Sequence, residues 1–207
     1  MPESWRAGSP ITPQMPKDAI ALKDPSIVRH RDRWHLFFTM RGRTRSHAVA
    51  WCACENLDDL PSCRAEVLGN HAAYCCAPQI FFFRPHGVWY LIAQAKDGQW
   101  DPEYQAVFAT TKDIDDPASW TALTPLGLER PAGEHPAYLD FWVIADGDHT
   151  YVFLTTDDGH IWRSRTEIDD FPHGWSPPTL AYCGDVFEAN HVYKLADRSG
   201  YLNLVEA

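Results

Sequence analysis

The amino-acid sequence predicts an all-β fold in which small antiparallel sheets are arranged as the blades of a propeller. The first observation is composition: 45% of the 207 residues are hydrophobic, and 9 Trp, 8 Tyr and 10 Phe suit a β-rich domain with a sizeable core. The second is a repeat, in which two apolar runs joined by a polar turn recur four times at intervals of roughly 50 residues. The third is that no segment has the apolar periodicity of an amphipathic helix.

Each of the four units opens with a pair of predicted strands. In order, the pairs are KDPSIVRHRDRWHLFFTM from Lys23, APQIFFFRPHGVWYLIAQ from Ala77, LDFWVIADGDHTYVFLTT from Leu139 and FEANHVYKLADRSGYLNLVEA from Phe187. The turns of the last three pairs contain residues that tolerate a positive φ or form local hydrogen bonds, namely His86-Gly87, Asp146-Gly147-Asp148 and Ser199-Gly200. The flanking runs are rich in β-branched and aromatic residues, so each pair is predicted to form a β-hairpin.

Further strands are predicted beyond the hairpins. The third strands of the first three units cover residues 47–54, 106–111 and 161–166. A polar turn follows each of them, the first at Leu57-Asp58-Asp59, and Trp120 and Trp175 then mark an outer strand in units two and three. Three or four short antiparallel strands in every repeat favour a propeller, and a β-sandwich is the alternative because its strands are also regularly spaced.

The charge balance limits the partners. Lys and Arg number 18 and Asp and Glu 28, a net charge of −10 that argues against nucleic acids and anionic membranes. No apolar run approaches the ~18 residues of a membrane span. The N-terminal stretch MPESWRAGSPITPQMP lacks the apolar central region of a signal peptide. We therefore expect neither nucleic acid nor membrane as a partner.

The cysteines do not predict a metal site. They are Cys52, Cys54, Cys63, Cys75, Cys76 and Cys183, with no CxxC pair, and the sequence contains no HExxH motif. We expect buried free thiols. Two alternatives stay open: a zinc site built with some of the 10 His, and one or two disulfides if the protein is exported.

Three carboxylates occupy the same position in the repeat. When the units are aligned on their first strands, the opening residue is Asp24, Asp140 or Glu188 in units one, three and four, and Ala77-Pro78 in unit two. The innermost strands of a propeller line its central channel and begin at one mouth, so we expect these acids to converge. Each precedes an apolar run, and a buried carboxylate is costly unless it is paired or functional. Loop capping by the carboxylates is the alternative, but three equivalent positions favour function.

Glycoside hydrolysis is the chemistry that needs carboxylates on opposite sides of a pocket. One acid protonates the leaving oxygen while the other activates water or attacks the sugar. A third carboxylate nearby raises the pKa of the acid by like-charge repulsion.

At these residues the sequence resembles glycoside hydrolase family 62, which shares a clan with family 43. Four stretches carry the resemblance: Leu22-Lys23-Asp24 with Ser26-Ile27-Val28; Ala77-Pro78 through Phe83 with Trp89 to Gln94; Leu139-Asp140 with Val143 to Gly147; and Phe187-Glu188-Ala189 with Val192-Tyr193, Tyr201-Leu202 and Val205-Glu206-Ala207. The resemblance extends from about Leu22 to the end and implies a five-bladed propeller. We expect an N-terminal extension over residues 1–21 and the catalytic propeller domain over 22–207, truncated at its C-terminus with about three and a half blades present.

The resemblance also implies roles for individual residues. Asp24 would be the general base, Glu188 the general acid and Asp140 the residue that tunes Glu188, while Lys23 and Gln94 would bind substrate. Such an enzyme inverts the configuration at the anomeric carbon and has its base and acid roughly 6.5–9.5 Å apart. The implied substrate is an α-L-arabinofuranosyl side chain of arabinoxylan, and the implied location is extracellular. No cofactor is required, and the family allows a structural calcium ion in the central channel.

Three positions depart from the family pattern. Pro25 replaces the usual aromatic residue and reads more like family 43, which leaves a β-xylosidase or an arabinanase open. Ala95 stands where the family has a Trp in the substrate cleft, with Trp100 as a candidate replacement. Asn190-His191 replaces the usual Val-Gln. A non-catalytic, carbohydrate-binding propeller fragment is a further alternative.

Overall fold

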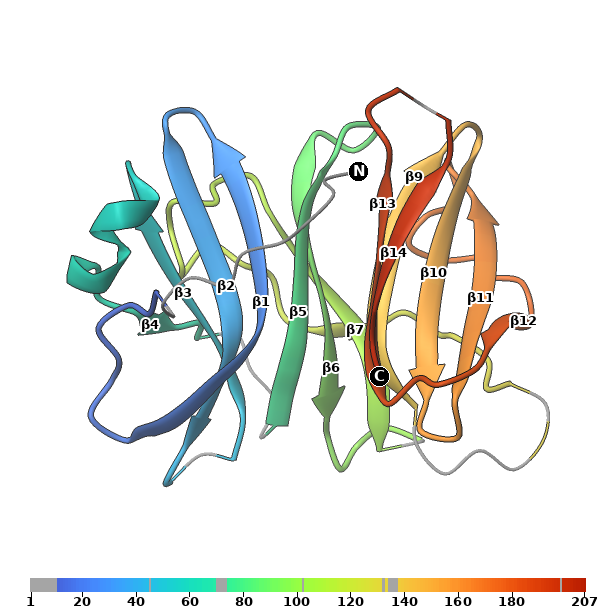
Figure 1. The fold of residues 1–207 in the computed structure, drawn as a ribbon, viewed down its shortest axis with the longest axis horizontal. Helices are drawn as coiled ribbons and strands as arrows, with labels where there is room; N and C mark the ends of the chain where they lie inside the picture. Colours follow the sequence, from blue (N-terminus) through green and yellow to red (C-terminus); the bar gives the residue numbers. More distant parts are fainter. Residues whose placement is uncertain are drawn as a thin grey trace.

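The structure, a computed structural model, describes residues 11–44, 46–69, 74–101, 103–131, 133, 138–197 and 199–207. Its strands form four antiparallel sheets that follow one another along the chain, here called sheets one to four (Figure 1). Within each sheet the strands are hydrogen-bonded in chain order, so the first strand always lies at one edge. The prediction of an all-β fold is therefore confirmed.

Each sheet corresponds to one predicted unit. Sheet one consists of β1 (Ala19–His30), β2 (Arg33–Gly42), β3 (Ala48–Cys54) and β4 (Glu66–Val67). Sheet two consists of β5 (Tyr74–Phe83), β6 (Val88–Lys96), β7 (Tyr104–Thr111) and β8 (Thr124–Pro125). Sheet three consists of β9 (Leu139–Asp146), β10 (His149–Thr156), β11 (His160–Glu167) and β12 (Thr179–Cys183). Sheet four consists of β13 (Glu188–Lys194) and β14 (Tyr201–Glu206).

The outer parts of the sheets differ in detail from the prediction. A short 3₁₀ helix, η1 (Leu57–Ser62), replaces the polar turn after β3. The outer strands β8 and β12 begin four residues after Trp120 and Trp175. Trp120 is buried in the core between sheets one and two, and Trp175 packs against the core between sheets two and three. In the described part of the chain, no helix has the length and apolar composition that a membrane span requires.

The predicted extension over residues 1–21 is partly described. Its first ten residues lie outside the described part of the chain. Gln14 forms a parallel bridge with Arg64, and its backbone exchanges hydrogen bonds with Cys63 and Ala65. The strand β1 already begins at Ala19, so the end of this segment belongs to sheet one.

The hydrophobic cores lie between neighbouring sheets. One buried cluster joins Phe37 and Trp51 of sheet one to Leu91 and Val107 of sheet two. A second cluster packs sheet two against sheet three in the same way, through Phe83, Ile92, Phe141, Val152 and Leu154. Since full burial of such a side chain contributes about 1.5–3 kcal/mol, these clusters account for face-to-face packing of successive sheets.

The innermost strands of the first three sheets are bulged at equivalent positions. At each bulge two residues of the inner strand stand opposite one residue of the next strand. The first bulged residue is Asp24 (φ 54°), Ala77 (φ 51°) or Asp140 (φ 51°), all in the left-handed region. Such a conformation costs on the order of 1–3 kcal/mol for a non-glycine residue, and a bulge redirects the side chain that it carries.

Side chains two positions after these bulges connect the sheets. The Ser26 hydroxyl accepts a hydrogen bond from a backbone N–H of β5 (3.0 Å). The Gln79 amide donates to the Val143 carbonyl (2.7 Å) and accepts from the Val143 N–H (2.6 Å). The Trp142 indole donates to the Val192 carbonyl (2.8 Å). Each innermost strand is thereby hydrogen-bonded to the next, directly beside the bulge that carries the first residue of the repeat.

Candidate active site

The bulged strand ends surround a pocket of about 200 Å³. Its lining residues are Asp24, Pro25, Ala77, Pro78, Asp140, Phe141, Trp142, Ala189, His191 and Glu206. Asp24 and Asp140 thus share one pocket although they are 116 positions apart in the sequence. The structure therefore brings these two carboxylates together, as the repeat predicted.

Asp140 lines the pocket and interacts electrostatically with the charged residues around it. Burial, together with the nearby carboxylates Asp24 and Glu188, raises the pKa of its carboxyl group to about 7. Lys23 and a hydrogen bond from the Ala189 backbone N–H act against this increase. Glu188 therefore belongs to the same cluster of charges, and Asp140 can hold or release a proton near neutral pH.

Lys23 is the cation of this cluster. Its ammonium lies 3.8 Å from Asp24 Oδ2. Burial lowers the pKa of Lys23, but attraction to Asp24, Glu188 and Asp140 outweighs burial and raises it overall. Lys23 is therefore charged at neutral pH. The same Asp24 oxygen is buried and has no hydrogen-bond partner among the described residues, so the Lys23 ammonium is the charge that stabilises it.

Comparison with known proteins identifies the family. The sequence model of Glycosyl hydrolase family 62 matches residues 5–207. The chain belongs to glycosyl hydrolase family 62.

Three relatives illustrate the similarity. Alpha-L-arabinofuranosidase C of Cellvibrio japonicus is 33% identical over 213 residues, which cover 100% of this chain and 32% of that protein. The catalytic domain of a Coprinopsis cinerea family 62 α-L-arabinofuranosidase superposes with a TM-score of 0.84 at 30% identity, covering 96% of this chain and 64% of that domain. A family 62 hydrolase solved in complex with xylotriose has a TM-score of 0.81 at 25% identity, covering 96% and 66%. The chain thus spans about two thirds of the solved relatives and one third of the curated relative.

Gln94, the second predicted substrate ligand of this family 62 chain, is buried behind the pocket. Its side chain is only 6% exposed, and its amide nitrogen donates to the Tyr138 carbonyl (3.0 Å). The Cys76 thiol donates to the Gln94 amide oxygen (3.7 Å). Gln94 is not among the residues that line the described pocket, so its contact with substrate stays a prediction. Trp100 packs against the core between sheets one and two.

Two further polar residues line the pocket that were not predicted as site residues. Glu206 stands opposite Glu188 in the β13–β14 register, and its carbonyl accepts the Phe187 N–H (2.8 Å). His191 stacks on Trp142 with ring centroids 4.1 Å apart, and burial lowers its pKa against the attraction of Asp24. The hairpin register set by the Ser199-Gly200 turn is the signal that could have placed Glu206 beside Glu188.

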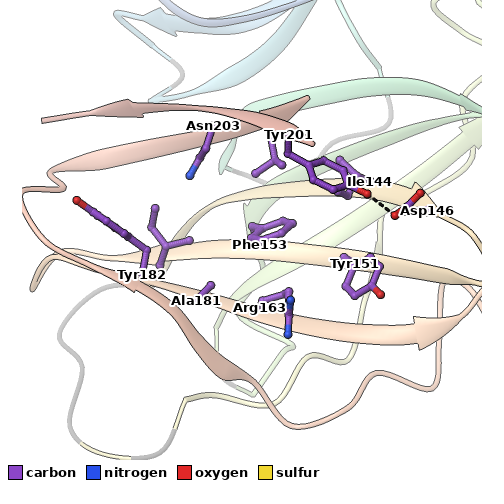
Figure 2. Close-up of a pocket in the computed structure, with 11 residues that line it drawn as sticks. Ile144, Asp146, Tyr151, Phe153, Arg163, Ala181, Tyr182, Tyr201 and Asn203 are labelled. Carbon is purple, nitrogen blue, oxygen red and sulfur yellow. Dashed lines mark hydrogen bonds between the residues drawn. The ribbon is translucent and has the colours of Figure 1, made fainter. Parts of the chain in front are cut away.

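A second, larger pocket of about 340 Å³ lies between sheets three and four (Figure 2). Its walls are mainly aromatic and aliphatic, and Asp146 is its single carboxylate. Lys194 and Tyr201 both hydrogen-bond Asp146 and lower the pKa of its carboxyl group. A lone carboxylate held ionised by two partners cannot supply the acid and base pair that glycoside hydrolysis needs.

The described residues do not assemble a metal centre. No group of three or more His, Cys, Asp or Glu side chains among them has the geometry to hold a metal ion. The structural calcium ion that the family resemblance allows stays a prediction, and we assign no step to such an ion.

Proposed function

We propose that this chain carries the catalytic carboxylates of an inverting α-L-arabinofuranosidase that removes arabinofuranosyl side chains from arabinoxylan. The observation that carries the proposal is the pocket shared by Asp24 and Asp140, with Glu188 coupled electrostatically to Asp140. Membership of family 62 and the arabinofuranosidase activity named for two relatives support an arabinofuranosyl group as the sugar that is released. The xylotriose complex of a third relative supports a xylan backbone as the polymer.

In this proposal Asp24 and Glu188 perform the proton transfers. Asp24 removes a proton from a water molecule, whose oxygen attacks the anomeric carbon from the face opposite the leaving group. Glu188 gives its proton to the departing xylosyl oxygen as the glycosidic bond breaks. The position of Asp24 in the lining of the pocket supports its role as the base.

Asp140 and Lys23 adjust the charge around this pair. A carboxyl group with a pKa of about 7 can donate a hydrogen bond to a sugar hydroxyl in its protonated form and repel a second anion in its ionised form. The Lys23 ammonium, 3.8 Å from Asp24, favours the ionised base. Gln94, whose amide bonds the Tyr138 carbonyl, is the second residue that this proposal assigns to substrate binding.

The proposal includes the propeller and its location. Three four-stranded sheets and one two-stranded sheet, together spanning about two thirds of the solved relatives, support a five-bladed propeller of which this chain holds about three and a half blades. We place the enzyme outside the cell, as the family resemblance implies.

A family 43-type specificity is the second candidate. Pro25 lines the pocket directly beside Asp24, at the position where the sequence departs from the family 62 pattern. A changed wall there would alter which sugar fits. Release of xylose, or of arabinose from linear arabinan, would favour this candidate.

Proton NMR of arabinoxylan mixed with the protein tests the proposal. We expect free arabinose whose first anomeric signal is that of the inverted β form, and no release by the Glu188→Gln variant. Glu66→Gln, an exposed change on β4, is the matched control and should release arabinose normally. Appearance of the α form first would overturn inversion. Undiminished release by Glu188→Gln would remove Glu188 as the acid. Binding of arabinoxylan by the wild-type protein without any release of arabinose would favour the non-catalytic alternative.

A further inference from the structure

His35 is a titratable side chain that the proposed mechanism does not use. It lies on β2 of sheet one and is completely buried, at 0% exposure. It shares a face of the strand with Phe37, which packs in the buried cluster between sheets one and two. An ionisable group in such a place is costly to charge unless it is paired. The protonation state of His35 therefore bears on how the two sheets pack.

A hydrogen bond from Trp51 determines which ring nitrogen of His35 carries the proton. The Trp51 indole N–H of β3 donates to His35 Nδ1 (3.3 Å), and the two rings are stacked with centroids 6.1 Å apart. Because an indole nitrogen can only donate, Nδ1 presents a lone pair and the proton of the neutral ring is on Nε2. Among the described residues Nε2 has no hydrogen-bond partner, and Asp115 Oδ1 lies 3.8 Å away.

The charges around His35 do not compensate for its burial. Burial is the largest influence and lowers the pKa of the imidazole. Asp115 and Asp113, which follow β7 of sheet two, favour the charged ring, whereas Arg33 and His30 of sheet one oppose it. Asp115 is already paired with Arg33, whose Nη1 lies 2.5 Å from its Oδ1. A positive charge on His35 would therefore share an occupied carboxylate.

We propose that His35 is an acid-sensitive latch between sheets one and two. In its neutral form the ring accepts the Trp51 hydrogen bond and packs between the sheets. A second proton has to bind Nδ1, where it would face the Trp51 donor, break that hydrogen bond and place a positive charge in the buried layer. Both sheets line the carboxylate pocket, through Asp24 and Ala77, so acid should weaken the packing that holds these two walls together. The proposal does not depend on the catalytic assignment.

The direction of the pH effect follows from the lowered pKa of His35. The unfolded chain binds this proton near the ordinary pKa of about 6.5, and the folded chain binds it only at lower pH. The contribution of neutral His35 to stability is therefore fully present above about pH 6.5 and is lost as the pH falls below it. Asp140, whose pKa is raised, acts in the opposite direction over part of this range, so the test uses Asp140→Asn as its background.

Urea unfolding between about pH 5 and pH 8 measures the latch. The urea midpoint of Asp140→Asn should fall as the pH is lowered through about 6.5. The fall should be smaller in the double variant Asp140→Asn/His35→Asn, because the asparagine carbonyl can accept the Trp51 hydrogen bond and does not titrate. His47 and His191, whose pKa values burial also lowers, titrate in both proteins and cancel in the comparison. An acid-induced fall of equal size in both proteins would overturn the proposal.

Imidazole NMR of the folded protein is a second test that does not require His35→Asn to fold. Long-range ¹H–¹⁵N spectra of the wild type should show His35 with its proton on Nε2 at about pH 8 and a titration midpoint below about 6.5. Trp51→Phe keeps an aromatic ring but removes the donor, so the midpoint should rise toward the ordinary value. A proton on Nδ1 in the wild type, or an unchanged midpoint in Trp51→Phe, would contradict the latch.

Discussion

Sheets one and two have different residues at a bulge of the same backbone conformation. At the bulge of β1 stands Asp24 with φ 54°, and at the bulge of β5 stands Ala77 with φ 51°. Both residues line the same pocket, and both are followed by a proline and then by a buried polar side chain that connects neighbouring sheets. Sheet two thus reproduces the geometry of sheet one without its carboxylate.

The comparison separates what the fold requires from what the chemistry requires. Because Ala77 adopts the left-handed conformation without a carboxylate, the bulge belongs to the way the sheets pack around the pocket. Asp24 and Asp140 use that bulge to direct a carboxylate into the pocket. An acid at a bulge is therefore dispensable for folding and available for catalysis, and substitutions at these positions test that separation.

The largest effect is expected when sheet one is made to resemble sheet two. The variant Asp24→Ala should keep the fold, because Ala77 occupies the same conformation at the equivalent position. It should lower kcat on arabinoxylan by about 10³-fold, since a general base contributes roughly 10²–10⁴-fold. Steady-state assays of arabinose release by wild type and variant measure this.

The matched control for this variant is Asp32→Ala, an exposed acid in the turn between β1 and β2. It should leave both kcat and the unfolding midpoint unchanged. If Asp24→Ala retained activity within a few-fold of wild type, the separation between fold and chemistry would fail at its most important residue. If it lost cooperative unfolding, the acid would be needed for the bulge itself.

Much of this arrangement could be predicted from the sequence, because the repeat carries the register. The hairpin pairs and the shared opening position of Asp24, Ala77 and Asp140 follow from apolar runs whose spacing is preserved between units. The bulge itself could not be predicted, since neither Asp nor Ala marks a positive φ as glycine would. Contacts that depend on side-chain direction were equally hidden, such as the hydrogen bond from the Gln94 amide to the Tyr138 carbonyl.

The pH dependence of stability is the next effect and concerns the third acid. The pKa of Asp140 is raised from its ordinary value of 3.8 to about 7 by burial and by the neighbouring carboxylates Asp24 and Glu188. Between about pH 4 and pH 7 the unfolded chain has released this proton and the folded chain still holds it. The free energy of unfolding should therefore fall through this window, by an amount on the order of a few kcal/mol.

Comparison with Asp140→Asn isolates this contribution. An amide does not titrate, so the variant should show a flatter dependence between pH 4 and pH 7, measured by urea unfolding at several pH values. Below about pH 4 and above about pH 7 the wild-type Asp140 contribution should no longer change. Equal slopes for both proteins would mean that Asp140 is not the group that binds the extra proton.

The smallest effect is expected in sheet two, where only the backbone is tested. Ala77→Val places a β-branched side chain in the left-handed region and should destabilise the protein by about 1–2 kcal/mol, whereas Ala77→Gly removes the Cβ clash and should change stability by about 1 kcal/mol or less. Urea unfolding of both variants measures the difference. If valine were tolerated as well as glycine, the left-handed bulge of β5 would not be a constraint of the fold, and the conformation shared with Asp24 and Asp140 would need a functional cause instead.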